Sequence, residues 1–329
     1  MLSIKNNIGS LPEGAYVWKK YEIIPPYLSF IGNEDFTLKT YNTTKNWNGI
    51  LEYSTDALIW NTWDGTEISS SGNVLYLRGT GNTNITGSSA NNRFVFTGTD
   101  ALKIVCEGNI ESLLDCMTVR DGGHPIMIND CYQSMFRGCT ALTTAPELPA
   151  TTLANNCYGY MFRDCTALTT APSLPATTLA YGCYQNMFQG CTALTTAPEL
   201  PVTTLSSSCY YSMFRGCTAL TTAPSLPATT LANNCYGYMF YGCTALTTIP
   251  SLPATTLANN CYGYMFYGCS LIKLSTTQTG EYQIAYRIPT SGTGTTATSA
   301  LAKMFQNTRG TFNGTPSINT TYYTSNTVV

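Results

Sequence analysis

A unit of 26 residues repeats six times through the middle of the chain, with no insertion or deletion between copies. It reads C-Y-x-x-M-F-x-x-C-T-A-L-T-T-x-P-x-L-P-x-T-T-L-x-x-x, and the last copy departs from this pattern after Cys269. A fixed period in the twenties is typical of a solenoid, in which each unit buries its apolar side only by stacking on its neighbours. We therefore expect an elongated stack with a long repeated surface, a form better suited to binding than to catalysis. The copies begin at Cys131, Cys157, Cys183, Cys209, Cys235 and Cys261.

The whole chain is predicted to be mainly β with short helical turns. Residues 27–118 alternate short runs rich in Tyr, Trp, Val, Ile and Thr with Asn, Gly, Ser and Asp, which predicts a β-sandwich domain. Its strands are expected near 27–31, 36–41, 50–54, 74–78, 93–97 and 102–106. Residues 1–26 are assigned to an N-terminal arm or attachment segment, 119–272 to a leucine-rich-repeat-like solenoid of six units with an N-terminal cap, and 273–329 to a C-terminal cap.

Two kinds of segment are expected in each copy. The stretch between the two cysteines is predicted to be a helical turn, because Cys131, Met135, Phe136 and Cys139 would then share one face. The following Leu-Thr-Thr-x-Pro-x-Leu-Pro should be extended, with very short strands because proline cannot donate to a sheet. Leu142, Leu148 and Leu153, with their counterparts in the other copies, should form columns that point inward.

The cysteines are numerous but aligned with the apolar positions of the repeat. Twelve of the fourteen lie in the copies as C-x7-C, where we expect them to be reduced and to pack as small hydrophobic side chains. Disulfides are the alternative that an even count allows. Zinc is disfavoured because seven intervening residues do not suit a zinc knuckle and His124 is the only histidine.

Composition excludes several classes of function. Charged residues make up 10% of the chain and the net charge is −2, with no cluster of Lys and Arg, so nucleic acid is not an expected partner. No apolar run approaches the roughly 20 residues that a membrane-spanning helix needs. The first residues lack the apolar core of a secretory signal, which predicts either that a signal has been removed or that the chain leaves its cell by another route, assembly into a virus particle included.

The sequence offers little for catalysis. His124 lies in a Gly-Gly-His-Pro turn, and neither a dinucleotide-binding glycine motif nor a P-loop is present. We therefore expect no enzyme activity, no cofactor and no metal. Trp60 and Trp63 are expected in or beside the core of the β-domain, with a platform for a sugar ring as the sharper alternative.

The copies differ at a few positions, which are the candidates for ligand binding. Counting the first cysteine of each copy as position 0, positions 2, 3 and 6 vary and should face solvent. They are rich in Tyr and Arg, which are over-represented at binding hot spots, although solvent-facing positions also tolerate variation without a function. A second exposed stripe is expected at Glu147, Ser173, Glu199, Ser225 and Ser251. The candidate ligand-binding residues are Arg137, Tyr160, Arg163, Tyr211, Arg215, Tyr238, Tyr241, Tyr264 and Tyr267.

The repeat M-F-x-G-C-T-A-L-T-T-A-P-x-L-P-A-T-T-L resembles the BspA-type leucine-rich repeat of gut and oral bacterial surface proteins and of phages that infect such bacteria. Residues 51–56, 75–79 and 107–110 resemble the β-domain that often precedes these repeats, and 313–323 resembles their usual ending. The resemblance implies non-enzymatic adhesion or receptor binding, with a host-cell glycan or protein as partner.

A phage virion component such as a tail or head fibre is the first hypothesis, its N-terminal segment contacting other virion proteins, and the location would be the virion surface. The alternatives are a secreted bacterial cell-surface adhesin and a purely structural solenoid. The sequence leaves a homo-oligomer open.

Overall fold

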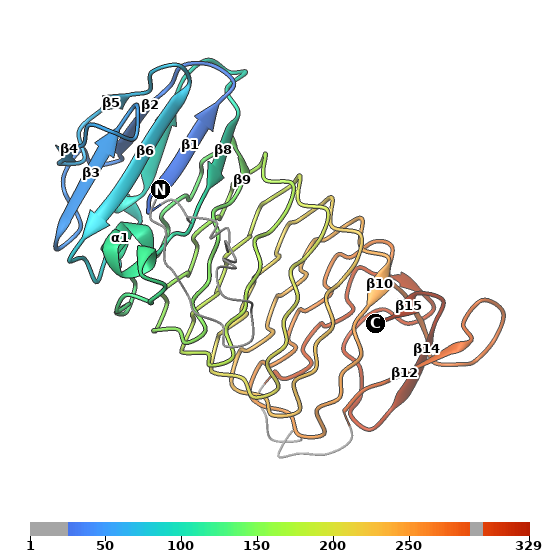
Figure 1. Cartoon of the computed structure of the whole chain (residues 1–329). Coiled ribbons are helices and arrows are strands. Elements are labelled where there is room, and N and C mark those ends of the chain that lie inside the picture. Colours follow the sequence, from blue (N-terminus) through green and yellow to red (C-terminus); the bar gives the residue numbers. More distant parts are fainter. Residues whose placement is uncertain (1–25, 290–298) are drawn as a thin grey trace, which may run out of the picture.

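The computed structural model describes residues 26–289 and 299–329, and within them the chain is elongated and mainly β (Figure 1). A two-sheet region lies at one end, the repeats are stacked along the middle, and a small sheet covers the other end. The predicted N-terminal arm falls outside the described residues, apart from residue 26.

The first region contains two sheets, and six of their nine strands overlap the expected ones, whereas β4, β5 and β9 were not predicted in this region. The larger has the order β4-β3-β6-β1-β8-β9 and the smaller β5-β2-β7. Phe30 of β1 and Phe96 of β7 bring them face to face, with ring centroids 5.2 Å apart. The strands are β1 (Leu28–Gly32), β2 (Thr37–Thr40), β3 (Ile50–Ser54), β4 (Asn61–Trp63), β5 (Ile68–Ser69), β6 (Val74–Thr80), β7 (Phe94–Thr97), β8 (Ile104–Glu107) and β9 (Leu142–Thr144), with a 3-10 turn at Ala90–Asn92.

Trp63 confirms the core interpretation and Trp60 departs from it. Trp63 is buried, stacks on Trp47 with centroids 5.1 Å apart, and donates from Nε1 to the Thr66 carbonyl at 2.7 Å. Trp60 is half-buried between Tyr27 and the guanidinium of Arg78, which lies 4.0 Å from its ring centroid.

One α-helix among the described residues, α1 (Ser112–Arg120), was not predicted. It packs on β6 at Gly79, where a Cβ atom would lie 1.7 Å from the Leu113 carbonyl oxygen. Only glycine permits this approach. The helix has a kink at Asp115, whose backbone is extended, so it gives no regular apolar stripe in the sequence.

The segment between the two cysteines is not helical, so that prediction is wrong. Backbone N–H groups at odd positions donate to the next copy, as from Tyr132 to the Cys157 carbonyl at 2.9 Å. Those at even positions donate three residues back within the copy, as from Met135 to the Tyr132 carbonyl at 3.2 Å. Half of the donors thus close local turns and half join neighbouring copies, so no donor of this segment is left for a helix. We call each copy in this stack a rung, and its positions −1 to 8 the turn segment.

The turn segment repeats every four residues rather than every 3.6. Positions −1, 3 and 7 have positive φ, for example 60° at Asp130, 59° at Ser134 and 74° at Gly138. A positive φ at the third residue of a turn is the geometry of type II. As a result positions 0, 1, 4, 5 and 8 point inward. Position 1, missed in the sequence, adds a buried column made of Tyr132, Tyr158, Tyr184, Tyr210, Tyr236 and Tyr262.

The extended segments follow the prediction closely. Leu142, Leu148 and Leu153 are buried, and so are most of their counterparts. Pairing between rungs is limited to single parallel bridges between threonines, as from Thr170 to Thr196 and from Thr152 to Thr178. The prolines that follow explain why these bridges do not grow into strands.

The first rung continues the larger sheet of the β-domain. β9 pairs in parallel with β8, and Phe94 donates its N–H to the Met135 carbonyl at 2.7 Å, just as a turn segment would. The β-domain itself therefore caps this end of the stack.

A seventh rung closes the other end, although the sequence identified six. Tyr262, Tyr264 and Phe266 donate their N–H groups to the carbonyls of Ala300, Ala302 and Met304 at 2.8–3.0 Å. Phe305 stacks on Phe266 with centroids 5.4 Å apart. Residues 300–308 thus occupy positions 0 to 8, with Ala300 and Thr308 where the other rungs have cysteine.

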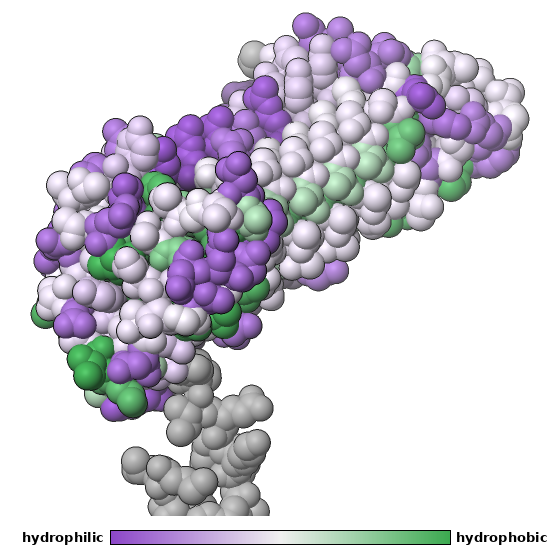
Figure 2. All heavy atoms as spheres, turned by 90° about the horizontal axis from the view of Figure 1, so that it is seen from above, coloured by the Kyte–Doolittle hydropathy of each residue, from purple (hydrophilic) through white to green (hydrophobic). Residues whose placement is uncertain are grey.

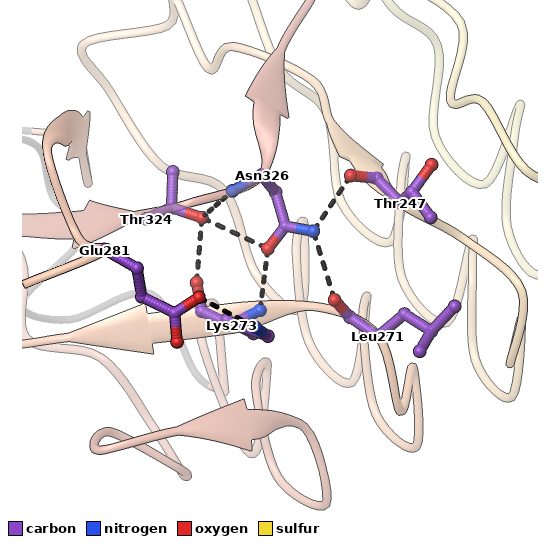
Figure 3. Close-up of polar contacts among 6 residues, drawn as sticks. All are labelled: Thr247, Leu271, Lys273, Glu281, Thr324 and Asn326. Atoms are coloured by element: carbon purple, nitrogen blue, oxygen red, sulfur yellow. Dashed lines mark hydrogen bonds and ion pairs between the residues drawn. The ribbon is translucent and has the colours of Figure 1, made fainter.

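Beyond it, a C-terminal sheet is tied to the stack by Asn326 (Figure 3). The Asn326 amide donates to the carbonyls of Thr247 at 2.8 Å and Leu271 at 3.0 Å, and its oxygen accepts from the Lys273 N–H at 2.7 Å. The sheet has the order β12-β14-β11-β13, and β10 pairs with β15 beside it. The bounds are β10 (Thr248–Ile249), β11 (Lys273–Ser275), β12 (Ile284–Arg287), β13 (Arg309–Gly310), β14 (Thr321–Thr324) and β15 (Thr327–Val328).

Candidate functional site

The nine candidate residues lie on the outward side of the turn segments, and all nine are partly exposed. The column at position 3 is not uniformly accessible, because its smaller members Ser134, Asn186 and Ser212 are buried. Tyrosine therefore reaches solvent from a backbone position where shorter side chains do not.

Five tyrosines gather on rungs four to six. Tyr238 stacks on Tyr264 with centroids 4.6 Å apart and planes 5° apart, and Tyr241 stacks on Tyr267 at 4.7 Å and 1°. Tyr211 tilts against Tyr238 at 5.5 Å. The two rings of one rung also lie close together. Their centroids are 5.9 Å apart for Tyr238 and Tyr241 and 6.0 Å apart for Tyr264 and Tyr267.

Two cations adjoin these rings. The Arg215 guanidinium carbon lies 4.7 Å from the Tyr241 centroid and 5.9 Å from that of Tyr238. Lys303 of the seventh rung places Nζ 5.7 Å from the Tyr264 centroid. We call this set the tyrosine patch: Tyr211, Arg215, Tyr238, Tyr241, Tyr264, Tyr267 and Lys303.

Arg137, Tyr160 and Arg163 lie on the same side of the stack but in rungs one and two, outside the patch. Nε of Arg163 lies 3.3 Å from Oδ2 of Asp164, and its guanidinium carbon lies 5.8 Å from the Tyr160 ring centroid. Its charge is thus balanced by a neighbour, unlike that of Arg215.

The tyrosines at position 3 adopt a backbone conformation that suits them poorly. φ is 59° at Tyr160 and 58° at Tyr238 and Tyr264, in the left-handed region. For residues with a Cβ atom this region costs roughly 1–2 kcal/mol, least for Asn and Asp. Asn186 holds the same position at a φ of 55°, so the fold does not require tyrosine there.

Two phenols of the patch, those of Tyr211 and Tyr238, stay protonated at neutral pH. Burial raises the pKa of Tyr211, and burial together with the neighbouring Tyr211 and Tyr264 raises that of Tyr238. These hydroxyls can therefore donate hydrogen bonds to a ligand.

The repeated thiols are not available for chemistry. All fourteen cysteines are buried and free, and burial raises the pKa of Cys191 and of Cys243 to about 12. The second thiol of a rung donates to the Phe carbonyl of the preceding rung, as from Cys191 Sγ to Phe162 at 3.0 Å. Their burial confirms the packing role predicted from the sequence.

A buried carboxylate near the first rung went unnoticed in the sequence. Glu111 Oε2 lies 2.7 Å from His124 Nδ1, and burial raises the pKa of Glu111 although His124 opposes the shift. The pair lines a cavity of about 340 Å³ together with Thr151 and Thr152. His124 thereby anchors the loop after α1 to the start of that helix.

The second stripe is exposed at all five predicted positions, and its first members line a shallow cavity of about 300 Å³ between prolines. Glu147 and Ser173 border it alongside Pro146 and Pro172. This surface carries no aromatic ring or cation, so we place the candidate site at the tyrosine patch.

Over residues 26–289 and 299–329, no three His, Cys, Asp or Glu side chains are grouped to hold a metal ion. Over the same residues, no helix has the length and apolar character needed to cross a membrane. Comparison with protein-family models, with curated proteins and with solved structures gives no match to this chain.

Proposed function

We propose that the chain is a non-enzymatic receptor-binding protein, built as a β-sandwich followed by a BspA-type leucine-rich-repeat solenoid. It presents the tyrosine patch to a glycan or protein on a host cell, as a component of a phage virion. The resemblance of the repeats supports the class of protein, and the surface of the turn segments supports the location of the site.

The observation that carries the proposal is the choice of tyrosine at position 3 in rungs five and six. Tyr238 and Tyr264 hold left-handed backbone positions where Asn would fit at lower cost, and their side chains are partly exposed. A local conflict of this kind, without compensation in the core, is expected at functional sites. Clustered tyrosine beside arginine is also the composition of binding hot spots.

Replacing Tyr238 and Tyr264 together by Asn tests the site. Asn occurs naturally at this position in rung three, so the stack should fold normally. We expect fluorescently labelled protein to lose at least about tenfold in affinity for cells of a susceptible strain, because aromatic hot-spot residues contribute about 1–2 kcal/mol or more each. Flow cytometry over a panel of gut and oral bacteria gives the readout.

Tyr41→Asn is the matched control. Like Tyr238, Tyr41 is accessible to solvent and lies beside an arginine, but it belongs to the β-domain; the guanidinium carbon of Arg93 lies 3.8 Å from its ring centroid. Equal cell binding by the wild type and the double variant would remove the patch as the site. Mass spectrometry of purified virions tests the phage assignment, and absence of the chain from the particles would favour the cell-surface adhesin.

A further inference from the structure

Four tyrosines of the patch cover part of their ring faces by stacking in pairs. Tyr238 and Tyr264 cover one another's inner faces at 4.6 Å, and Tyr241 and Tyr267 do so at 4.7 Å. Stacking of a sugar on an aromatic face, as on a tryptophan platform, is therefore restricted here. The edge of an aromatic ring carries partial positive charge, and each phenol adds a hydrogen-bond donor. These edges favour an acceptor-rich, negatively charged ligand.

The charges of the repeats are separated between two sides. Residues 131–272 contain only six charged side chains: Arg137, Arg163, Arg215, Asp164, Glu147 and Glu199. The turn segments carry the three arginines, with Lys303 as a fourth cation, against two acids: Asp164, which neutralises Arg163, and Asp130 at position −1 of the first rung. Both glutamates lie on the extended segments. Within a chain of net charge −2, the turn side is thus cationic.

Three of these four cations, Arg137, Arg215 and Lys303, have no ion-pair partner among the described residues, and the last two belong to the tyrosine patch. Among the described residues no ion pair involves Arg215 or Lys303, and each is held instead beside a tyrosine ring. They come from the rungs on either side of the Tyr238–Tyr264 pair. A cation held over a ring keeps its charge and its donors for a ligand.

We infer that the occupant is an acidic polysaccharide whose chain runs along the turn side, with carboxylate or sulfate groups at Arg215 and Lys303. This inference rests on the proposed function and specifies the chemistry of its ligand. The outward positions 2, 3, 6 and 7 of the six copies hold only Gln, Gly, Ser, Asn, Tyr, Arg and Asp. Such amides and hydroxyls suit sugar hydroxyls, whereas a peptide would find no apolar pocket for its side chains.

The same surface is a poor match for nucleic acid. Nucleic-acid strands carry a phosphate every ~3.4 Å, and their binding depends on many Lys and Arg side chains. Two unpaired cations beside neutral tyrosines suit a polymer whose charges are sparse. Seen from above, the stack carries a pale and green band along its length, with strongly hydrophilic residues along one edge (Figure 2).

Isothermal titration calorimetry with defined polymers tests the inference. Polygalacturonate and dextran sulfate are the acidic probes, with methyl-esterified polygalacturonate and dextran as uncharged counterparts of the same backbones. We expect binding to at least one acidic polymer, weakening as salt rises, and none to its uncharged counterpart. Arg215→Gln combined with Lys303→Gln should weaken binding roughly tenfold, because two exposed ion pairs with the polymer are lost.

Lys103→Gln in the β-domain is the matched control and should bind as the wild type does. The inference is overturned by equal binding to the methyl ester, by full affinity of the double variant, by binding to poly-glutamate alone, or by binding to neither acidic polysaccharide. If the charge variant still binds cells while Tyr238→Asn with Tyr264→Asn does not, the proposed function stands and the acidic ligand fails.

Discussion

The second cysteine of each rung combines two properties that few side chains share. It is small enough for a close-packed column, and its thiol donates to a carbonyl of the rung before, as from Cys217 Sγ to Phe188 at 3.1 Å and from Cys243 Sγ to Phe214 at 3.0 Å. That carbonyl already accepts a local bond, so the thiol occupies its second lone pair. Thr308 replaces the cysteine in the seventh rung and donates within its own rung instead, from Oγ1 to the Phe305 carbonyl at 2.7 Å.

Burial of the thiols predicts a loss of stability in alkali. The pKa values of Cys183 and Cys235 are raised to about 12 and that of Cys261 to about 11, against roughly 8.5 in an unfolded chain. Unfolded chains then lose protons that folded chains keep, so the free energy of unfolding should be constant up to about pH 8.5 and fall as pH rises toward 11–12. Urea unfolding at pH 7, 9, 10 and 11 measures this decline.

Thiol alkylation provides the control for that experiment. At pH 8 the native protein should not react with iodoacetamide, and all fourteen thiols should react after denaturation without reductant. A free energy of unfolding that stays level to pH 11, or a native protein that is alkylated quickly, would contradict the buried thiol columns.

At the scale of the element, the turn segment derives its shape from backbone conformation more than from contacts. Every fourth residue has positive φ, and position 7 is glycine in five of the six copies. Asp164 is the exception, at a φ of 62°. Because Asp and Asn tolerate this conformation better than other residues with a Cβ atom, the exception is consistent with a conformational requirement.

Gly242 isolates that requirement, since a Cβ atom built on it meets no other atom within 4 Å and φ is 73°. We expect Gly242→Ala to lower the free energy of unfolding by about 1–2 kcal/mol, the usual cost of the left-handed region. Gly242→Asn should lower it by clearly less. Urea denaturation of the two variants measures both free energies of unfolding. Equal losses would mean that the presence of any Cβ atom, rather than the positive φ, determines stability at this position.

The sequence predicted the inward columns of the turn segment for a wrong reason. Positions 0, 4, 5 and 8 fit one face of a helix, yet they also fit a coil that turns every four residues. Position 1 does not separate the two forms, because at about 100° per residue it lies between positions 8 and 5 on a helix, so both forms bury Tyr158. Single-sequence periodicity did not separate 3.6 from 4 over nine residues. The exposed tyrosines were found because variation between copies does not depend on this distinction.

At the scale of the whole molecule, both ends of the stack are closed by chain outside the copies. The β-domain supplies Phe94 and β8 to the first rung, and residues 300–308 with the C-terminal sheet close the last. In a repeat protein each unit is stabilised mainly by its neighbours, so an end that lacks cover unfolds first. In the sequence, residues 301–307 echo the Met-Phe turn but are assigned to the C-terminal cap, because this stretch follows Cys261 by 39 residues, counted to Ala300, and lacks both cysteines.

Asn326 is predicted to hold this C-terminal closure. It is buried and makes three hydrogen bonds to backbone groups of Thr247, Leu271 and Lys273 (Figure 3). Asn326→Ala leaves those groups without partners, at about 1–3 kcal/mol for a buried unsatisfied group. We expect faster hydrogen exchange in 247–275 and 300–328, with 28–107 unchanged.

Glu281→Gln is the control for the same closure. It weakens the ion pair between Glu281 and Lys273 Nζ, which are 2.8 Å apart and both partly exposed, so exchange should hardly change. If Asn326→Ala accelerates exchange evenly along the chain, the closure is not a local one.

Each rung donates backbone hydrogen bonds to the next rung from the same positions. The contacts that close the two ends of the stack do not depend on the number of rungs between those ends. Deleting residues 183–208 would remove one whole copy and place Cys209 where Cys183 now lies. Each backbone hydrogen bond between rungs would then be made to the equivalent residue of another copy. The tyrosine patch would then sit one rung, or about 4.8 Å, nearer the β-domain and be otherwise unaltered. A gene of this design can lengthen or shorten the distance between its β-domain and the tyrosine patch by unequal recombination, without a new fold at any step.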